Sequence, residues 1–256
     1  MNLFTQFLSE LQAVTNLFWR VLKGLKKKPR YFAEIITQMD QIGVGSFGIV
    51  ILTGFFTGGV IILQSYATLE YYGAQSNAGQ GVATALIREL GPVLAALMVA
   101  GRVGSAISAE LGSMVVSQQI DAMRALGTSP VRKLVTPRLI ALVVTLPLLT
   151  IVADLFGIIG GGVVARQLHG LDLNIYISSV RTGAKFVDLV GGLIKPIVFG
   201  LIIGLIACHR GLTTSGGTVG VGESTTRAVV AASIWVIISD FFLSKLLQSL
   251  FGATLF

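Results

Sequence analysis

Charged side chains are scarce in this sequence. They make up 12% of the 256 residues, whereas 53% of the residues are hydrophobic; soluble domains carry roughly 25% charged residues. Several apolar stretches exceed the roughly 20 residues that span a bilayer. This composition excludes an ordinary soluble domain and indicates an all-α integral membrane protein, and the length allows one helical bundle.

Cysteine and histidine are also scarce, and their absence excludes several kinds of site. The only cysteine, Cys208, cannot form an intramolecular disulfide. His169 and His209 have no second ligand at metal spacing, so we expect no metal site. No Ser/His/Asp or Cys/His set indicates catalysis. The glycine-rich stretch 216–222 lacks the GxxxxGK[ST] pattern, so we expect no ATP site in this chain.

The N-terminus lacks the pattern of a secretory signal, so we expect the spanning helices themselves to direct insertion. The formal net charge of +7 would suggest nucleic acid in a soluble protein. Here the basic residues flank apolar stretches, which is typical of membrane topology and of contact with lipid head groups. Twelve of the 19 Lys and Arg residues lie in segments 1–30, 114–138 and 209–227. This asymmetry predicts a cytoplasmic N-terminus, and no nucleic-acid partner is expected.

Five transmembrane helices are predicted, at about residues 42–69, 88–112, 139–164, 186–208 and 228–250, with a polar loop at about 166–185 between the third and the fourth. Residues 3–22 form a predicted amphipathic helix, and a lysine-rich stretch follows it. We therefore divide the chain into an interfacial helix with a basic segment, 1–30, and a membrane domain, 31–256. The alternative for the first helix is ordinary packing within the bundle. The pair Gly91–Pro92 predicts a kink.

The second span carries charges that are costly at the bilayer centre, roughly 3 kcal/mol each. Arg88, Glu89, Arg102 and Glu110 all lie on or near it. Small residues recur along it every four positions, which places them on one face where another helix can approach closely. We expect this helix at the centre of the bundle, packed through Ala96, Ala100, Gly104, Ser108 and Gly112.

Three of the intramembrane charges are expected at similar depth: Arg88, Glu89 and Lys195. One interpretation is a polar patch in an outward-facing cavity that meets a charged head group. The alternative is that Glu89 neutralises Lys195 or Arg88 and only holds helices together. The other charges at this depth are expected to form structural pairs or to reach the interface: Arg102, Glu110, Asp154, Asp240 and Lys245.

Residues 119–126 predict a short helix that ends at Gly127. Ile120, Met123 and Leu126 share one face of it. An exposed helix with an apolar stripe between two spans requires a partner, although the helix could instead lie on its own bundle.

The stretches LIRELGPVLAAL at 86–97, AGRVGSA at 100–106 and AELG at 109–112 resemble the MlaE/YrbE family, the permeases of lipid-transporting ABC systems. The resemblance covers most of the chain after about residue 43. It implies a homodimeric, non-catalytic permease in the bacterial inner membrane. Its expected partners are a second copy of itself, cytoplasmic ABC ATPase subunits that use the ATP, a periplasmic MCE-domain protein and a phospholipid substrate. The implied role is to maintain the lipid asymmetry of the outer membrane.

The resemblance also implies roles for individual residues. The lipid-binding residues would be Leu63, Tyr66, Arg88, Glu89 and Lys195. The helix near 119–127 would couple the permease to the ATPase through Ile120, Asp121, Met123, Arg124, Leu126 and Gly127. Lys245 departs from the family pattern and receives no role.

Two other classes remain open from the residues alone. An ion-coupled secondary transporter or channel would use Glu89, Asp154 and Asp240, and would need no nucleotide partner. A membrane scaffold would bind no lipid and would tolerate removal of these charges.

Overall fold

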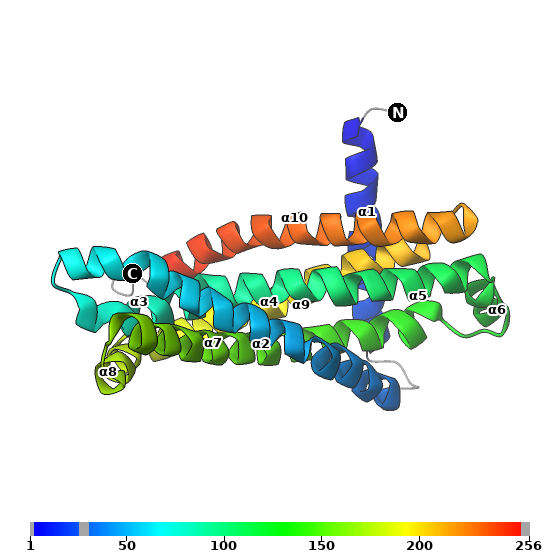
Figure 1. The fold of residues 1–256 in the computed structure, drawn as a ribbon. Coiled ribbons are helices and arrows are strands. Elements are labelled where there is room, and N and C mark those ends of the chain that lie inside the picture. Colours follow the sequence, from blue (N-terminus) through cyan, green and yellow to red (C-terminus); the bar gives the residue numbers. More distant parts are fainter. Residues whose placement is uncertain (1–2, 26–30, 252–256) are drawn as a thin grey trace. The chain divides into compact units, whose positions relative to one another are not determined.

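The computed structural model describes residues 3–25 and 31–251, with side chains for residues 8–24 and 31–250. Every regular element in these parts of the chain is helical (Figure 1). The chain divides into two compact units. Unit 1 comprises Met1–Ile42, Val99–Thr145 and Phe199–Val236, and unit 2 comprises Gly43–Met98, Leu146–Val198 and Ile237–Phe256.

Five helical stretches are long and apolar enough to cross a membrane, which confirms the predicted number of spans for the described residues. Each stretch extends past its predicted apolar segment at one end or both, because helices continue into their polar flanks. The stretches are α2 (Phe32–Tyr71), Gln75–Val116, Val131–His169, α9 (Phe186–Leu212) and α10 (Gly217–Phe251).

The second stretch changes its helical winding several times. It contains a 3₁₀ turn, η1, then α3, the π-helical turn η2, α4, a second π-helical turn η3, and α5. The π-helical turn η2 interrupts the α-helical winding immediately before Gly91–Pro92, where the sequence predicted a change in the helix. In chain order, from η1 to α5, the bounds of these six elements are Gln75–Asn77, Ala78–Ala85, Leu86–Leu90, Gly91–Val99, Ala100–Gly104 and Ser105–Val116.

Unit 2 is held together by backbone contact between α2 and α7 (Thr136–His169). A Cβ atom on Gly58 would lie 1.8 Å from the carbonyl oxygen of Gly157, and one on Gly54 would lie 2.4 Å from that of Ala153. Only glycine permits such an approach, which is the usual device for packing helices in a membrane. These glycines therefore decide how closely the two helices pack.

Helix α8 (Leu173–Gly183) lies where the sequence predicted a polar loop at 166–185. Asp172 caps it by accepting a hydrogen bond from the Asn174 N–H at 2.7 Å. Within unit 2, α8 packs on α3, and the Tyr176 hydroxyl donates to the Ile158 carbonyl at 2.9 Å. Burial raises the pKa of the Tyr176 phenol well above its usual range. The helix thus closes the end of the core around Ile62, Val82 and Leu86.

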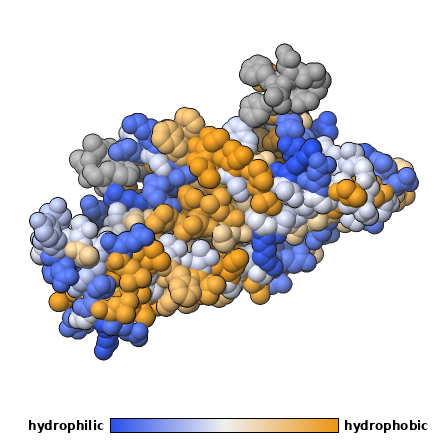
Figure 2. All heavy atoms as spheres, turned by 45° about the horizontal axis from the view of Figure 1, so that its top comes forward, coloured by the Kyte–Doolittle hydropathy of each residue, from blue (hydrophilic) through white to orange (hydrophobic). Residues whose placement is uncertain are grey.

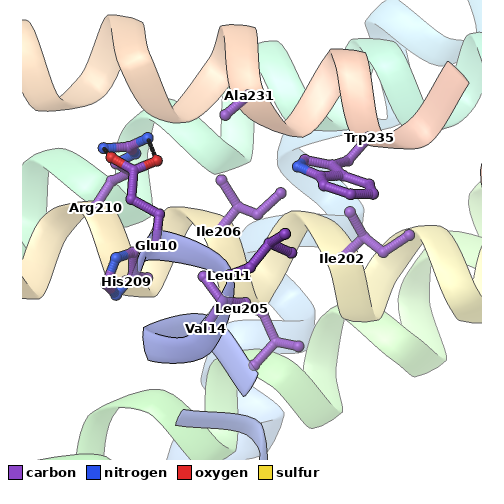
Figure 3. Close-up of a pocket in the computed structure, with 10 residues that line it drawn as sticks. All are labelled: Glu10, Leu11, Val14, Ile202, Leu205, Ile206, His209, Arg210, Ala231 and Trp235. Atoms are coloured by element: carbon purple, nitrogen blue, oxygen red, sulfur yellow. Dashed lines mark hydrogen bonds and ion pairs between the residues drawn. The ribbon is translucent and has the colours of Figure 1, made fainter. Parts of the chain in front are cut away.

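Unit 1 contains α1 (Leu3–Leu25), which rests on α9 and α10. Figure 3 shows Leu11 and Val14 of α1 directed toward the α9 side chains, beside the ion pair between Glu10 and Arg210. Arg210 Nη2 and Glu10 Oε2 lie 2.7 Å apart. The side chain of Trp19 is exposed on the same helix. The position of α1 in the membrane interface remains a prediction. Residues Lys26–Lys28 and Arg30 of the basic segment lie outside the described residues.

Elsewhere in unit 1, α5 packs on the end of α9, where a Cβ on Gly211 would lie 2.7 Å from the Leu111 Cβ atom, and on the connection after α9. A Cβ on Gly112 would lie 2.8 Å from the Thr214 hydroxyl, and Thr214 donates to Ser224 at 3.0 Å. The short helix α6 (Gln119–Ala125) follows α5, and the π-helical turn η4 (Val131–Val135) leads into α7.

Hydrophobic side chains reach the surface over wide areas, as the orange regions of Figure 2 show. Exposed large residues recur along α10, among them Val230, Ile234, Phe241 and Phe242. A helix with such a surface is suited to contact with lipid.

Candidate functional site

An ionic cluster lies within unit 2, inside three of the candidate spans. We call it the Lys195 cluster, and its members are Arg88, Glu89, Asp188, Lys195, Asp240 and Ser244. Lys195 is its centre, with only 2% of its side chain exposed. A buried ammonium is tolerated only where acceptors surround it.

The acceptors around Lys195 come from two other segments. Its Nζ atom donates to the Glu89 carboxylate at 2.6 Å and to the Ser244 hydroxyl at 2.8 Å. Asp240 Oδ1 lies 3.1 Å from the same Nζ atom, as an ion pair. Ser244 also donates to Glu89 at 3.1 Å. The ammonium thus holds η2, α9 and α10 together.

A further acceptor for Lys195 arises from proline chemistry. Pro92 has no N–H, so it cannot donate to the Arg88 carbonyl four residues earlier. Lys195 Nζ donates to that carbonyl at 2.8 Å. The π-helical turn η2 and Pro92 therefore create a backbone acceptor inside the apolar region, and α9 supplies the cation that satisfies it.

Arg88 forms an ion pair with Asp188, a partner that the sequence did not reveal. Its guanidinium donates to both carboxylate oxygens of Asp188, at 2.8 and 3.1 Å. Asp188 is almost fully buried, and it lies in the first turn of α9. Paired contacts of this kind are the strongest hydrogen bonds in proteins and fix the orientation of both groups.

The carboxylate of Glu89 is the accessible edge of the cluster. Its side chain is 43% exposed, whereas those of Lys195 and Asp188 are buried. Two basic side chains, Arg88 and Lys195, and three carboxyl groups, of Glu89, Asp188 and Asp240, meet in the cluster. The arrangement can therefore offer both charge signs to a ligand that enters beside Glu89.

The structure brings the three predicted charges Arg88, Glu89 and Lys195 together, and it also pairs them as the alternative interpretation expected. It separates the two predicted lining residues of α2. The Leu63 side chain is 50% exposed, whereas Tyr66 is buried and stacks on His169 with ring centroids 3.9 Å apart. Leu63 alone of these two is on the surface.

The predicted coupling segment forms α6, and Gly127 ends it with φ +73°. The Thr128 N–H bonds to the Met123 carbonyl and the Gly127 N–H to that of Arg124, which is the glycine-based stop expected from the sequence. Asp121 pairs with Arg124 at 2.8 Å on the surface.

The apolar stripe of α6 is divided between two environments. Ile120 is buried in unit 1, Met123 is half-buried and Leu126 is 82% exposed. The three residues advance around the helix because a spacing of three falls short of a full turn. Ile120 thus anchors the helix to its own unit, and Leu126 is left for another surface.

The ladder of small residues is buried along its whole length. Gly104 faces Ile203, Gly112 faces Thr214, and Ser108 donates to Ser224 at 3.5 Å, all within unit 1. Ala96, in unit 2, is also fully buried, as is Ala100 in unit 1. Nearby, the buried Arg138 pairs with Glu110 at 2.7 Å, so one of the charges expected to be structural has its partner.

Sequence reasoning missed Asp188, Asp240 and Ser244 as members of the cluster. Asp240 was visible as a charge in the last span, but nothing in the sequence identified Lys195 as its partner. Among the described residues, no group of three His, Cys, Asp or Glu side chains could hold a metal ion.

The chain matches a known protein family and several known proteins. The family model described as Permease MlaE matches residues 35–246, a range that contains the whole Lys195 cluster. A probable ABC transporter permease of Synechocystis sp. is 43% identical over 231 residues, which cover 90% of this chain and 86% of the relative.

Two further relatives carry more specific names. The intermembrane phospholipid transport system permease protein MlaE of Haemophilus influenzae is 35% identical over 238 residues, covering 93% of this chain and 90% of its own length. The chloroplastic protein TRIGALACTOSYLDIACYLGLYCEROL 1 of Arabidopsis thaliana is 39% identical over 226 residues, 88% of this chain and 63% of its own.

Proposed function

We propose, from the premise that this chain belongs to the MlaE family of ABC transporter permeases, that it moves phospholipid between the bacterial inner membrane and a periplasmic MCE-type carrier. The chain is a multi-pass, non-catalytic permease subunit of a lipid transporter. The phospholipid, the carrier and the direction of travel are the parts that need testing.

The observation that carries this proposal is the Lys195 cluster. A buried lysine with acceptors from two other segments, beside a carboxylate that is partly open, offers contacts for a polar head group inside an apolar region. Apolar side chains such as Leu63 would accompany the acyl chains. Ionisable groups at this depth in membrane proteins commonly mark substrate pathways.

The ion pairs of the cluster would exchange partners during transport. A lipid phosphate would take the place of Glu89 beside Lys195, and the released carboxylate would meet the positive part of a zwitterionic head group. Such an exchange keeps each buried charge paired, which avoids the large cost of an isolated one. Because the lipid would exchange with Glu89 of η2 beside Lys195 of α9, the affinity for lipid would depend on the relative positions of η2 and α9.

The energy would come from partner ATPases. We propose that ABC ATPase subunits dock on α6 through Leu126 and Met123, and that two copies of this chain pair to enclose the lipid. ATP-driven movement of α6 would change the lipid affinity of the cluster. A cycle of this kind requires two states that bind lipid differently, and ATP supplies the difference.

The setting we propose is the bacterial inner membrane, with the N-terminus in the cytoplasm and outer-membrane lipid asymmetry as the physiological purpose. The twelve basic residues in segments 1–30, 114–138 and 209–227 support this orientation. The name of the Haemophilus influenzae relative refers to intermembrane phospholipid transport, whereas the Arabidopsis thaliana relative is chloroplastic.

The ion-coupled alternative receives less support. Two of its three proposed carboxylates, Glu89 and Asp240, already pair with Lys195, so a small cation would have to displace a buried ammonium. The family match is also to permeases of ABC systems, which work with an ATPase.

The variant Glu89→Gln tests the proposal with little risk to folding, because this side chain is partly exposed. We expect less phospholipid to co-purify with the assembled transporter, and ATP-driven lipid transfer to fall by at least tenfold. Glu223→Gln, which removes an exposed carboxylate paired only with Arg227, is the matched control. Normal lipid recovery and transfer in Glu89→Gln, with the complex intact, would falsify the head-group role.

A further inference from the structure

Unit 1 contains a cleft whose charged lining is entirely basic. We call it the basic cleft. Its walls are α1, the connection after α6, η4 and the end of α9, and it encloses about 760 Å³. Arg20 and Lys23 line it from α1, Arg124 from α6, Arg132 from η4 and His209 from α9. None of its lining residues is Asp or Glu.

Two carboxylates form ion pairs on the helices that line the cleft, one of them with the lining residue Arg124. Asp121 pairs with Arg124 at 2.8 Å, and Glu10 pairs with Arg210 at 2.7 Å. Among the described residues, no carboxylate lies within ion-pair distance of Arg20 or Lys23. The positive charges of Arg20 and Lys23 therefore lack an acidic partner among the described residues, and such a surface attracts anions.

The walls of the basic cleft are fixed by packing. Leu17 and Val21 of α1 are buried, and the Arg210–Glu10 pair holds the same helix over α9 (Figure 3). The side-chain stem of Arg132 lies against the backbone of Gly24, where a Cβ would approach it to 3.1 Å. The cations on α1 and η4 are therefore held next to each other before any ligand arrives, which lowers the entropic cost of binding.

The chemistry of the surroundings favours one kind of anion. Helix α1 exposes Leu8 and Trp19, a pattern typical of helices that contact the membrane interface. Anionic phospholipids present their phosphates at that level, and basic pockets beside membrane helices commonly receive them. A lipid can also add hydrophobic contacts to its phosphate contact, which a free phosphate ion cannot do.

We propose that the basic cleft binds the phosphate of an anionic phospholipid, at a site different from the Lys195 cluster and not used for transport. The bound lipid fixes α1 and η4 to the membrane surface beside the coupling helix α6. Inorganic phosphate shares the same charge chemistry, so the experiment separates these two sources. The inference needs only that the chain lies in a membrane, and it does not rest on the transport proposal.

The test measures retention of phosphatidylglycerol by the full chain. The protein is placed in nanodiscs of phosphatidylcholine with a minor fraction of phosphatidylglycerol, transferred to detergent and analysed by native mass spectrometry. We expect the double variant Arg20→Gln/Lys23→Gln to bind phosphatidylglycerol roughly 20-fold more weakly, because two basic contacts to the phosphate are lost. Both side chains are exposed, so the variant is expected to fold normally.

The matched control removes two basic residues of the same unit outside the cleft. Lys133→Gln/Arg227→Gln changes the net charge equally, and both side chains are exposed. We expect its affinity for phosphatidylglycerol to stay within about twofold of the wild type, because neither side chain lines the cleft and salt screens exposed charges. Equal loss in the two double variants would overturn the proposal, since only general charge would then matter.

Two further arms identify other occupants. Displacement of phosphatidylglycerol by millimolar inorganic phosphate would overturn the lipid assignment in favour of a soluble anion. Normal lipid retention in Arg20→Gln/Lys23→Gln, with loss of the ATPase subunits, would show instead that the cleft docks a protein. The chain with Lys195→Met is measured in parallel, and retained phosphatidylglycerol there keeps the two lipid sites distinguishable.

Discussion

The Lys195 cluster of unit 2 and the basic cleft of unit 1 differ in how far their basic side chains are paired. In unit 2, Lys195 is buried and surrounded by Glu89, Asp240 and Ser244, so each cation in the cluster has a partner. In unit 1, the basic cleft leaves Arg20 and Lys23 open, without a carboxylate among the described residues. A ligand of the paired cluster must replace an existing contact, whereas a ligand of the open cleft supplies a contact that is missing.

The units also differ in how their helices meet. Gly58 and Gly54 of α2 place its backbone against that of α7 in unit 2. In unit 1 the short helix α6 keeps Leu126 on the surface, beyond its anchor Ile120. The two units thus differ in a close backbone contact in unit 2 and an exposed apolar side chain at the end of a short helix in unit 1. The variants below test each side of this contrast.

The largest effect is expected from Lys195→Met. It leaves Glu89 and Asp240 without their shared cation, and breaking a buried pair costs about 3–5 kcal/mol. We expect a loss of thermal stability in detergent and a loss of lipid transfer. Lys245→Met, at an exposed lysine of α10, is the control and is expected to change neither.

A companion variant separates stability from transport. Adding Glu89→Gln and Asp240→Asn to Lys195→Met removes the unpaired charges, so stability recovers in part while transfer remains lost. Full recovery of transfer in this triple variant would mean that the cluster only holds helices together.

The second prediction concerns the glycine contact of unit 2. Gly58→Ala places a methyl group against the Gly157 carbonyl, and overpacking of this kind costs about 2 kcal/mol. Thermal unfolding in detergent measures the change. Gly48, on the same helix, has nothing within 4 Å of an added Cβ, so Gly48→Ala serves as control. Equal melting temperatures for the two variants would contradict the close packing of α2 on α7.

The third prediction concerns the open surface of α6. Leu126→Asp places a charge where we propose that the ATPase docks, and we expect ATPase affinity to fall roughly tenfold, by about 1.4 kcal/mol. Val219→Asp is matched to it, since both side chains are 82% exposed and both lie in unit 1. Pull-down of the ATPase at several concentrations measures the difference. Equal capture by both variants would argue against docking on α6.

The smallest effect is expected from an ion pair in unit 1. Glu110→Gln leaves the buried Arg138 with a weaker partner, and we expect a loss of about 1 kcal/mol. Glu223→Gln breaks an exposed pair with Arg227 and is expected to cost less than about 0.5 kcal/mol. Urea or thermal unfolding of both proteins gives the comparison, and a reversed order would mean that burial does not set the value of these pairs.

Much of the architecture followed from local pattern. The five spans were predictable because long apolar stretches have few alternatives in a membrane. The end of α6 at Gly127 was predictable because a left-handed residue there favours glycine. The meeting of Arg88, Glu89 and Lys195 was expected because costly charges at one depth tend to face each other.

Other features depend on contacts that no local pattern encodes. Helix α8 was predicted as a loop, because its polar composition hides the few residues, Tyr176 among them, that pack on α3. The burial of Tyr66 depends on His169, which lies a hundred positions later. Asp188 and Ser244 look like ordinary polar residues near helix ends until the fold places them against Arg88 and Lys195.

Photo-cross-linking from position 90 tests most directly whether lipid meets the Lys195 cluster under control of ATP. A photoreactive residue replaces Leu90, an exposed residue of η2 next to Glu89, in the transporter assembled with its ATPase, and Phe56, an exposed residue of α2, is the control position for general membrane contact. We predict phospholipid adducts at position 90 whose yield changes several-fold when ATP is hydrolysed, while the yield at position 56 stays constant. Equal yields at position 90 with and without ATP, or no adduct there, would contradict a head-group site in this cluster.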